Sequence, residues 1–227
     1  MSDDEQPEPS ALGTKEFWDK CYENELKNFE ESGQEGEIWF GKRTEKRIVD
    51  FIIDSKTLSD CQIIDVGCGN GSLLRSLRSK GYRNLAGIDC CDAAVKLADA
   101  IAQQGRKSDQ ADILFATVDV LSSSPSSDFS HKFDLALDKG TYDAISLSED
   151  KESRLELYRK FIVHCLKQTD SRFVICSCNF TLDELKSQFC PVFEFVTDVP
   201  SPASFTFGGK SGNPTTVAVF RPANSLS

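Results

Sequence analysis

The sequence predicts an α/β fold: a doubly wound, mostly parallel sheet of seven strands with a helical cap near the N-terminus. Five short apolar runs alternate with helical patterns, and this alternation requires parallel strands joined by crossover helices. A glycine-rich segment directly follows the first apolar run, as expected where a strand turns into a helix. Two more apolar runs with no helical pattern between them end the chain and predict an antiparallel pair at one edge.

Composition divides the chain into three segments that fit one large domain of 227 residues. Residues 1–12 are acidic and contain proline, which predicts a disordered tail. Residues 13–56 carry helical patterns over about 14–29 and 43–55 and predict the cap, which we expect to lie over a bound ligand. Residues 57–222 hold the alternating strands and helices of the core.

The individual elements follow from periodicity and from the residues that end each run. Buried strands are predicted at 61–67, 84–89, 113–120, 133–140, 172–180, 193–199 and 215–220. Helices are predicted at 72–80, 92–104, 150–167 and 181–188. Gly81 and Gly105 follow two of these helices and are typical stop signals.

Charge and hydropathy exclude several classes of function. The formal net charge of −10 opposes binding to phosphate backbones, so we expect no direct contact with nucleic acid. No run of apolar residues reaches the length of a membrane span, and the acidic N-terminus is no secretory signal. We therefore expect a monomeric cytoplasmic protein, with presence in the nucleus left open.

The cysteines predict reduced thiols and no structural metal site. There are nine of them, an odd count in a chain without a secretory signal, and no C-x-x-C spacing occurs. Only two histidines, His131 and His164, accompany them. We expect most of the cysteines to be small core residues.

The strongest local motif is D-x-G-x-G-x-G at residues 65–71, between a predicted strand and a predicted helix. Glycines such as Gly67 and Gly69 let the backbone approach a ligand closely. The dinucleotide motif G-x-G-x-x-G would need a third glycine where Ser72 stands, which disfavours a dehydrogenase. The observed form is the one that methyltransferases use, although an ordinary tight turn remains the alternative.

Acidic residues end the next two strands, where doubly wound folds bind their ligands. Asp89 lies 24 positions after Asp65 (89 − 65), close to the spacing of an acid that binds ribose hydroxyls. Its alternative role is to cap the following helix. Asp119 is placed to accept a hydrogen bond from an adenine amino group, or is a solvated turn residue. We include the neighbouring Cys90 and Val120 among the predicted cofactor contacts.

Three residues on the same edge are candidates for catalysis. Asp138 ends the fourth strand and is expected to contact either the methionine end of a cofactor or the substrate amine. Toward the amine we expect it to orient rather than act as a strong base, since a nearby carboxylate raises an amine's pKa. Tyr142 follows it and is expected either to hold the substrate's amine cation through its ring face, as we also expect of Trp39 and Phe207, or to start a helix. Asn179 either orients an amine through its carbonyl or caps the helix near Thr181.

Longer segments resemble a known family. DKGTYDAI resembles a signature of seven-strand protein lysine methyltransferases. SALGTKEFWDKCYENEL, GEIWFG, SCNFT and FTFGGKSGN resemble, more narrowly, the family that methylates lysine on translation elongation factor 1-alpha. The resemblance extends from about residue 10 to residue 220, and Phe180 replaces the tryptophan that some relatives carry after the fifth strand.

This resemblance implies a Rossmann-like class I methyltransferase that uses S-adenosylmethionine to methylate a lysine of elongation factor 1-alpha. It implies cofactor contacts at Asp65, Gly67, Gly69, Asp89 and Asp119, with Asp138 facing the reaction centre and Trp39 lying over the cofactor as a lid. A small-molecule methyltransferase and a cofactor-binding scaffold without catalysis remain alternatives.

Overall fold

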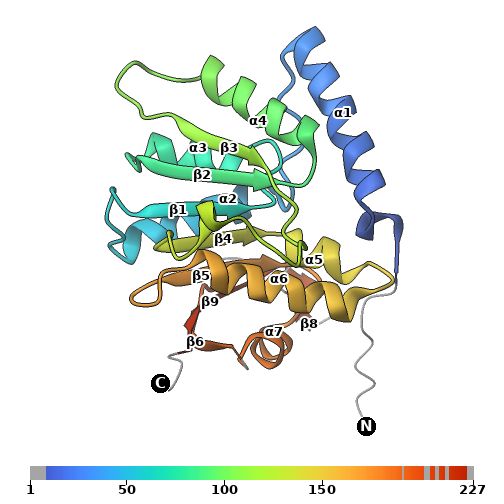
Figure 1. The fold of residues 1–227 in the computed structure, drawn as a ribbon, viewed down its shortest axis with the longest axis vertical. Helices are drawn as coiled ribbons and strands as arrows, with labels where there is room; N and C mark the ends of the chain where they lie inside the picture. Colours follow the sequence, from blue (N-terminus) through green and yellow to red (C-terminus); the bar gives the residue numbers. More distant parts are fainter. Residues whose placement is uncertain (1–8, 191, 202–204, 208–209, 213–214, 224–227) are drawn as a thin grey trace.

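A seven-stranded sheet forms the centre of the molecule (Figure 1). The computed structural model describes residues 9–190, 192–201, 205–207, 210–212 and 215–223. The strands are β1 (Gln62–Val66), β2 (Asn84–Asp89), β3 (Ile113–Thr117), β4 (Leu135–Lys139), β5 (Arg172–Ser177), β6 (Phe193–Asp198) and β9 (Thr216–Pro222). Their order across the sheet is β3-β2-β1-β4-β5-β9-β6.

The direction of the strands confirms a doubly wound, mostly parallel sheet. Strands β1 to β5 pair in parallel, and β9 is antiparallel to both β5 and β6. The last strand of the chain is therefore inserted between β5 and β6, so β6 and not β9 forms the edge. Strand order reverses at β1, and ligands bind at the carboxyl ends of strands beside such a point.

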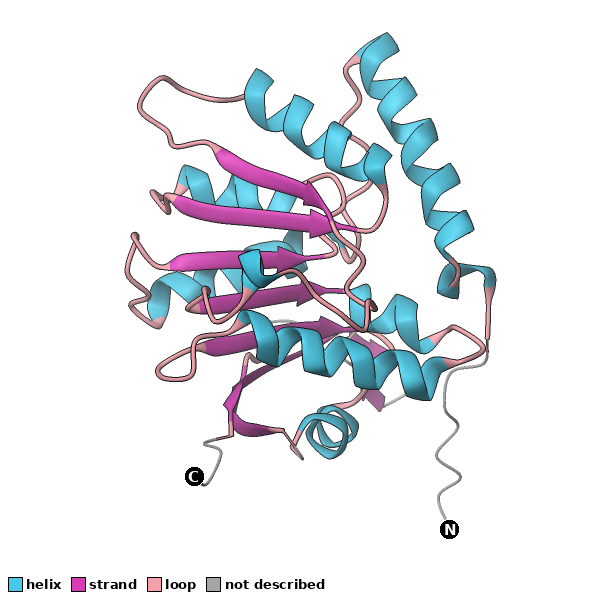
Figure 2. Cartoon of the chain, in the orientation of Figure 1, coloured by secondary structure: helices cyan, strands magenta, loops and turns pink. Residues whose placement is uncertain are grey.

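Helices cover both faces of the sheet (Figure 2). They are α1 (Lys15–Ser32), α2 (Gly41–Asp54), α3 (Ser72–Ser79), α4 (Asp92–Gln104), α5 (Thr141–Ser146), α6 (Lys151–Cys165) and α7 (Leu182–Phe189), with 3-10 turns η1 (Ala11–Gly13) and η2 (Ser127–Phe129). Apolar side chains of α2 and α3 pack on one face, and those of α5, α6 and α7 pack on the other. The helices that pack on the sheet are amphipathic because one side of each lies on it.

The segment predicted as a helical cap separates into two parts in space. Helix α1 packs along α4, and their shared cluster includes Tyr22, Leu97 and Ile101 (Figure 1). Helix α2 instead packs on the sheet, where Ile48 and Ile52 are almost fully buried. Only α1 and the connection to α2 thus cover the site, because the apolar side of α2 is taken up by the core. Of the predicted acidic tail, residues 1–8 lie outside the described part of the chain.

Two features were given no range from the sequence. One is the six-residue α5, which starts directly after β4, where a helix start at Tyr142 was one alternative; the other is a two-stranded sheet of β7 (Phe205–Phe207) and β8 (Lys210–Gly212), which follows β6 and precedes β9 along the chain. Both are too short to produce a periodic pattern in the sequence. Within the described ranges, no helix combines the length and the apolar character needed to cross a bilayer.

Candidate functional site

A cavity of about 260 Å³ opens at the carboxyl ends of β1 to β5, beneath α1. Its size approaches the lower end of ordinary small-molecule sites, about 300 Å³. The strand order arranges its walls in a row: residues after β3 lie at one end, then those after β2, β1, β4 and β5. The cavity is therefore elongated along the edge of the sheet.

The loop after β1 forms the floor of the cavity, and its glycines are required by the backbone. Gly67 and Gly69 both adopt positive φ, at 73° and 52°, where side chains are strained. A Cβ on Gly67 would lie 1.8 Å from Thr141 Oγ1, and one on Gly69 would lie 2.6 Å from the Tyr22 hydroxyl. The loop thus lines the cavity with backbone atoms, and the side chains of Thr141 and Tyr22 occupy the space where a Cβ would stand.

Asp89 is buried at the end of β2 and lines the cavity. Its two carboxylate oxygens accept hydrogen bonds from the backbone N–H groups of Gly69 and Cys91, each at 3.0 Å. Burial raises the pKa of Asp89, and these two backbone donors act in the opposite direction. A carboxylate has about four acceptor positions, so both oxygens can still accept a hydrogen bond from a ligand.

The end beyond Asp89 is formed by the segment after β3. Asp119 and Val120 line it together with Cys90. The carboxylate of Asp119 accepts a hydrogen bond from the backbone N–H of Leu121 at 2.9 Å and is otherwise exposed. This end therefore combines an apolar wall with a free acceptor, which suits a flat heterocycle that carries an amino group.

Trp39 lines the cavity, and a contact from β4 holds its backbone there. The Nζ of Lys139 donates a hydrogen bond to the backbone oxygen of Trp39 at 3.0 Å, and the rings of Trp39 and Trp18 meet edge to face at 5.0 Å. The Trp39 Nε1 is buried and has no hydrogen-bond partner among the described residues. A donor without a partner beside a cavity is available to a ligand acceptor.

The DKGT segment joins the fourth strand to the glycine loop. Asp138 accepts hydrogen bonds from the backbone N–H groups of Thr141 and Tyr142, at 2.9 and 3.0 Å, and from the Tyr158 hydroxyl. Thr141 Oγ1 in turn donates to the backbone oxygen of Val66 at 2.8 Å. The side chain of Asp138 is 1% exposed and is absent from the cavity wall, because its oxygens hold the start of α5.

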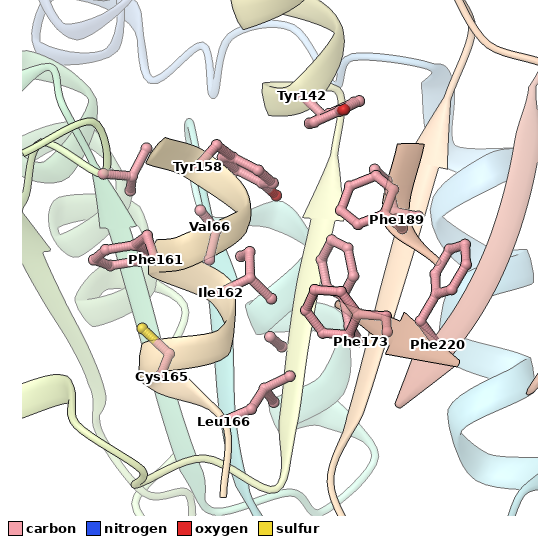
Figure 3. Packing of buried hydrophobic residues seen from close by; sticks show 14 of the residues in the cluster. Val66, Tyr142, Tyr158, Phe161, Ile162, Cys165, Leu166, Phe173, Phe189 and Phe220 are labelled. Carbon is pink, nitrogen blue, oxygen red and sulfur yellow. The ribbon is translucent and has the colours of Figure 1, made fainter. Parts of the chain in front are cut away.

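Tyr142 is likewise set back from the cavity. Figure 3 shows its ring among the buried aromatic side chains between the sheet and the helices, and the ring centroids of Tyr142 and Phe189 are 4.8 Å apart. Its hydroxyl donates to Gln188 and accepts a hydrogen bond from Arg159 at 3.1 Å. Tyr142 is therefore a core residue whose hydroxyl has its hydrogen-bond partners within the protein. This placement corresponds to the alternative in which Tyr142 belongs to the start of a helix.

Asp143, one residue further, is the acid of this segment that reaches the cavity. It is 5% exposed, lines the wall, and accepts hydrogen bonds from the Ser177 hydroxyl and from the backbone N–H of Cys178 at 2.6 Å. Burial raises its pKa above the usual value for an aspartate. These bonds tie α5 to the end of β5.

Asn179 stands beside Asp143 on the same wall. Its Nδ2 is directed at the backbone oxygen of Asp143 and the Ser146 hydroxyl, each at 3.4 Å. The Oδ1 therefore faces away from these groups and accepts a hydrogen bond from the Cys178 thiol at 3.5 Å. This arrangement leaves an amide oxygen at the cavity as an acceptor for an incoming N–H group.

Asp65 lies within β1 rather than in the loop and is 2% exposed. Burial raises its pKa to about 7, while the nearby Lys139 ammonium acts in the opposite direction. It does not line the cavity, because the strand continues for one more residue before the chain turns.

The structure thus brings most of the predicted site residues to one cavity. The predicted residues that line it are Trp39, Gly67, Gly69, Asp89, Cys90, Asp119, Val120 and Asn179. Asp65, Asp138 and Tyr142 lie behind its wall, and the side chain of Phe207 falls outside the described part of the chain. Sequence reasoning missed Tyr22, Lys139, Thr141 and Asp143, although the last three stand in the DKGTYD segment.

Comparison with known proteins places the chain among methyltransferases. Residues 57–219 match the family described as methyltransferase domain. Mouse EEF1A lysine methyltransferase 2 is 39% identical over 215 residues, covering 94% of this chain and 84% of the relative. The protein-lysine N-methyltransferase efm4 of Schizosaccharomyces pombe is 36% identical, covering 93% of this chain and 94% of the relative.

Solved structures agree on the fold. A TehB-like SAM-dependent methyltransferase from Corynebacterium glutamicum has a TM-score of 0.59 at 19% identity, covering 91% of this chain and 98% of its own. Magnesium protoporphyrin IX methyltransferase from Synechocystis, solved with bound SAM, has a TM-score of 0.56 at 14% identity, covering 88% and 96%. The glycine loop, the seven-stranded sheet and the extent of the match show that this chain belongs to the class I methyltransferases, in the family that includes EEF1A lysine methyltransferase 2 and efm4.

Proposed function

We propose that this protein transfers a methyl group from S-adenosylmethionine to a lysine side chain of translation elongation factor 1-alpha. The observation that carries the proposal is the elongated cavity, with the buried carboxylate of Asp89 above the glycine loop at one end and Asp143 and Asn179 at the other. The relatives named as EEF1A lysine methyltransferase 2 supply the identity of the acceptor protein.

The residues present fit S-adenosylmethionine. Asp89 has acceptor positions for the two ribose hydroxyls, and Asp119 lies where the amino group of adenine would be bound. Gly67 and Gly69 line the cavity with backbone that the amino-acid part of the cofactor can approach closely. The buried Nε1 of Trp39 is a donor still in need of an acceptor, such as a carboxylate.

The cofactor supplies an activated methyl group on its sulfonium, so the protein itself has to position an amine. In-line alignment of two reactants at near-attack distance is a large part of such catalysis. We propose that Asn179 Oδ1 accepts a hydrogen bond from the substrate amine. This hydrogen bond directs the lone pair of the amine nitrogen into the cavity. The amine must reach the site uncharged: burial in the cavity lowers a lysine's pKa, whereas the carboxylate of Asp143 on the same wall acts in the opposite direction.

A basic protein is the acceptor that the surface favours. Glu149 and Asp150 are exposed and line a second pocket. This pocket adjoins the cavity, because Gly13, Thr14 and Arg154 line both. Together with the net charge of −10, these carboxylates attract a lysine-rich segment toward the end of the cavity where the amine enters. The same charge supports our proposals that the protein binds no nucleic acid directly and acts as a monomer. We also propose that it binds no membrane and acts in the cytoplasm.

The test is transfer of a methyl group to the purified acceptor. Elongation factor 1-alpha is incubated with the protein and S-adenosylmethionine that carries a deuterated methyl group, and its peptides are analysed by mass spectrometry. The proposal predicts labelled lysine at one position, with much slower labelling by Asn179→Ala. Labelling of small molecules alone would favour the small-molecule alternative, and cofactor binding without transfer would favour the scaffold.

A further inference from the structure

We propose that Asp89, Cys90 and Cys91 form a binding site for a thiophilic divalent cation of the zinc group, and that a cation bound there closes the cofactor cavity. The site consists of three consecutive residues at the end of β2. One carboxylate oxygen and both Sγ atoms lie within 4.8 Å of one another, the one such group among the described residues.

The spacing of the two sulfurs matches tetrahedral coordination. The Sγ atoms of Cys90 and Cys91 are 3.8 Å apart. Two thiolates bound to Zn²⁺ at about 2.3 Å, with a tetrahedral angle between them, also lie about 3.8 Å apart. The spacing of the sulfurs therefore fits one cation bound to both, and an oxygen of Asp89 supplies a third ligand. The fourth position is left open for water.

The local fold holds these ligands together in the absence of any cation. The backbone N–H of Cys91 donates to one Asp89 oxygen at 3.0 Å, and Cys91 directly precedes α4. Cys91 is fully buried in the cluster between α1 and α4, which also contains Tyr22 and Leu97. Ligands that are already ordered lose little entropy on binding. Each thiol releases its proton to water when the cation binds, since the thiolate is the ligand, so the affinity for the cation rises with pH.

Asp89 and Cys90 line the wall of the cavity, and the fully buried Cys91 follows them directly in the chain, so we infer that a cation enters from the cavity. A cation there occupies the carboxylate that we assign to the ribose hydroxyls, so cation and cofactor compete. This competition rests on the proposed function, whereas binding of the cation by the two thiols does not. The absence of C-x-x-C argued against a structural zinc site, which a protein needs in order to fold. The proposed site has a different role: its cation regulates access to the cavity and is not needed for folding.

The first experiment titrates Cd²⁺ into the reduced full-length protein and follows the ultraviolet absorption of cadmium–thiolate bonds. We expect one strongly bound cation, with Cys90→Ser weakening its binding by at least about tenfold, since loss of even an outer partner of a metal ligand costs about 10–100-fold. Cys190→Ser removes an exposed thiol that is not part of the cavity wall and should bind Cd²⁺ as the unmodified protein does. Unchanged binding by Cys90→Ser would overturn the proposal.

Cys90 is the better position for this test, because it is half-buried while Cys91 is fully buried. Thermal unfolding of Cys90→Ser and Cys90→Ala checks that each variant is folded. Retention of the Cd²⁺ signal in both folded variants would contradict the site.

The second experiment repeats the titration with saturating S-adenosylhomocysteine. Weaker cation binding, by at least about tenfold, supports competition through Asp89. Strong cation binding that the ligand leaves unchanged, in a protein that binds the ligand, would overturn the closure of the cavity while leaving the proposed methyltransferase function intact. A protein that binds the cation and not the ligand would contradict the proposed function instead.

Discussion

Gly67 offers the most quantitative test of the cavity floor. Replacement by alanine adds a Cβ at a residue with φ of 73°, where the left-handed backbone costs about 1–2 kcal/mol for a non-glycine residue. The same Cβ would stand 1.8 Å from Thr141 Oγ1, which donates a hydrogen bond to Val66. Moving Thr141 aside breaks that bond, worth about 0.5–1.5 kcal/mol. We therefore expect Gly67→Ala to lower the free energy of unfolding by about 1.5–3.5 kcal/mol.

Gly33 provides a matched control. It has the same φ of 73° at the end of α1, and a Cβ there would have no neighbour within 4 Å. Gly33→Ala should therefore show only the backbone cost of about 1–2 kcal/mol. The assay is urea unfolding of both variants, with equilibrium dialysis of S-adenosylmethionine in parallel. We expect weaker cofactor binding in Gly67→Ala alone. Equal destabilisation together with unchanged binding in both variants would refute the account of the loop.

Four further predictions concern the site and its surroundings. Asp89→Asn should weaken cofactor binding by about 10–150-fold, because a hydrogen bond to a charged group contributes about 1.5–3 kcal/mol. Asp92 is exposed, and the Asp92→Asn variant should bind the cofactor as the unmodified protein does in the same dialysis. Tyr142→Phe should destabilise the fold by about 1 kcal/mol and leave turnover per folded molecule unchanged, because its hydroxyl bonds within the core; a large loss of turnover with normal stability would contradict that placement. Burial raises the pKa of Asp65 to about 7, so its ionisation should make the folded protein less stable as the pH rises from about 4 to 7, by about 4 kcal/mol at most. Asp65→Asn should lose this dependence in unfolding experiments between pH 4.5 and 8, and parallel pH profiles for the two proteins would count against it. Asn179→Ala should slow methyl transfer and leave cofactor affinity unchanged, and a fall in affinity alone would assign Asn179 to the cofactor.

The strands could be predicted because buried parallel strands appear in the sequence as short apolar runs. The order at the edge of the sheet could not, since nothing in the residues of β9 specifies that it enters between β5 and β6. The apolar side of α2 was visible at Ile48 and Ile52, but its packing partner was not. Whether an amphipathic helix covers a sheet or a cavity depends on the other elements, which periodicity does not describe.

The residues of the site also divide into those that the sequence could place and those that it could not. Asp89, Asp119 and Asn179 were predicted correctly as residues of one edge, because they follow parallel strands and the carboxyl ends of such strands meet. Whether a given side chain faces the cavity depends on the local turn. Asp138 holds the start of α5, and Asp143, about one helical turn later, reaches the cavity instead. A spacing argument cannot separate these two carboxylates, since both lie near the end of β4.

The most direct measurement of the central claim is a crystal structure of the protein with bound S-adenosylhomocysteine. Our account predicts the ligand along the carboxyl ends of β1 to β3, with its ribose hydroxyls within hydrogen-bond distance of the Asp89 carboxylate and its sulfur directed toward Asn179. A ligand bound elsewhere, with no hydrogen bond to the Asp89 carboxylate, would contradict it.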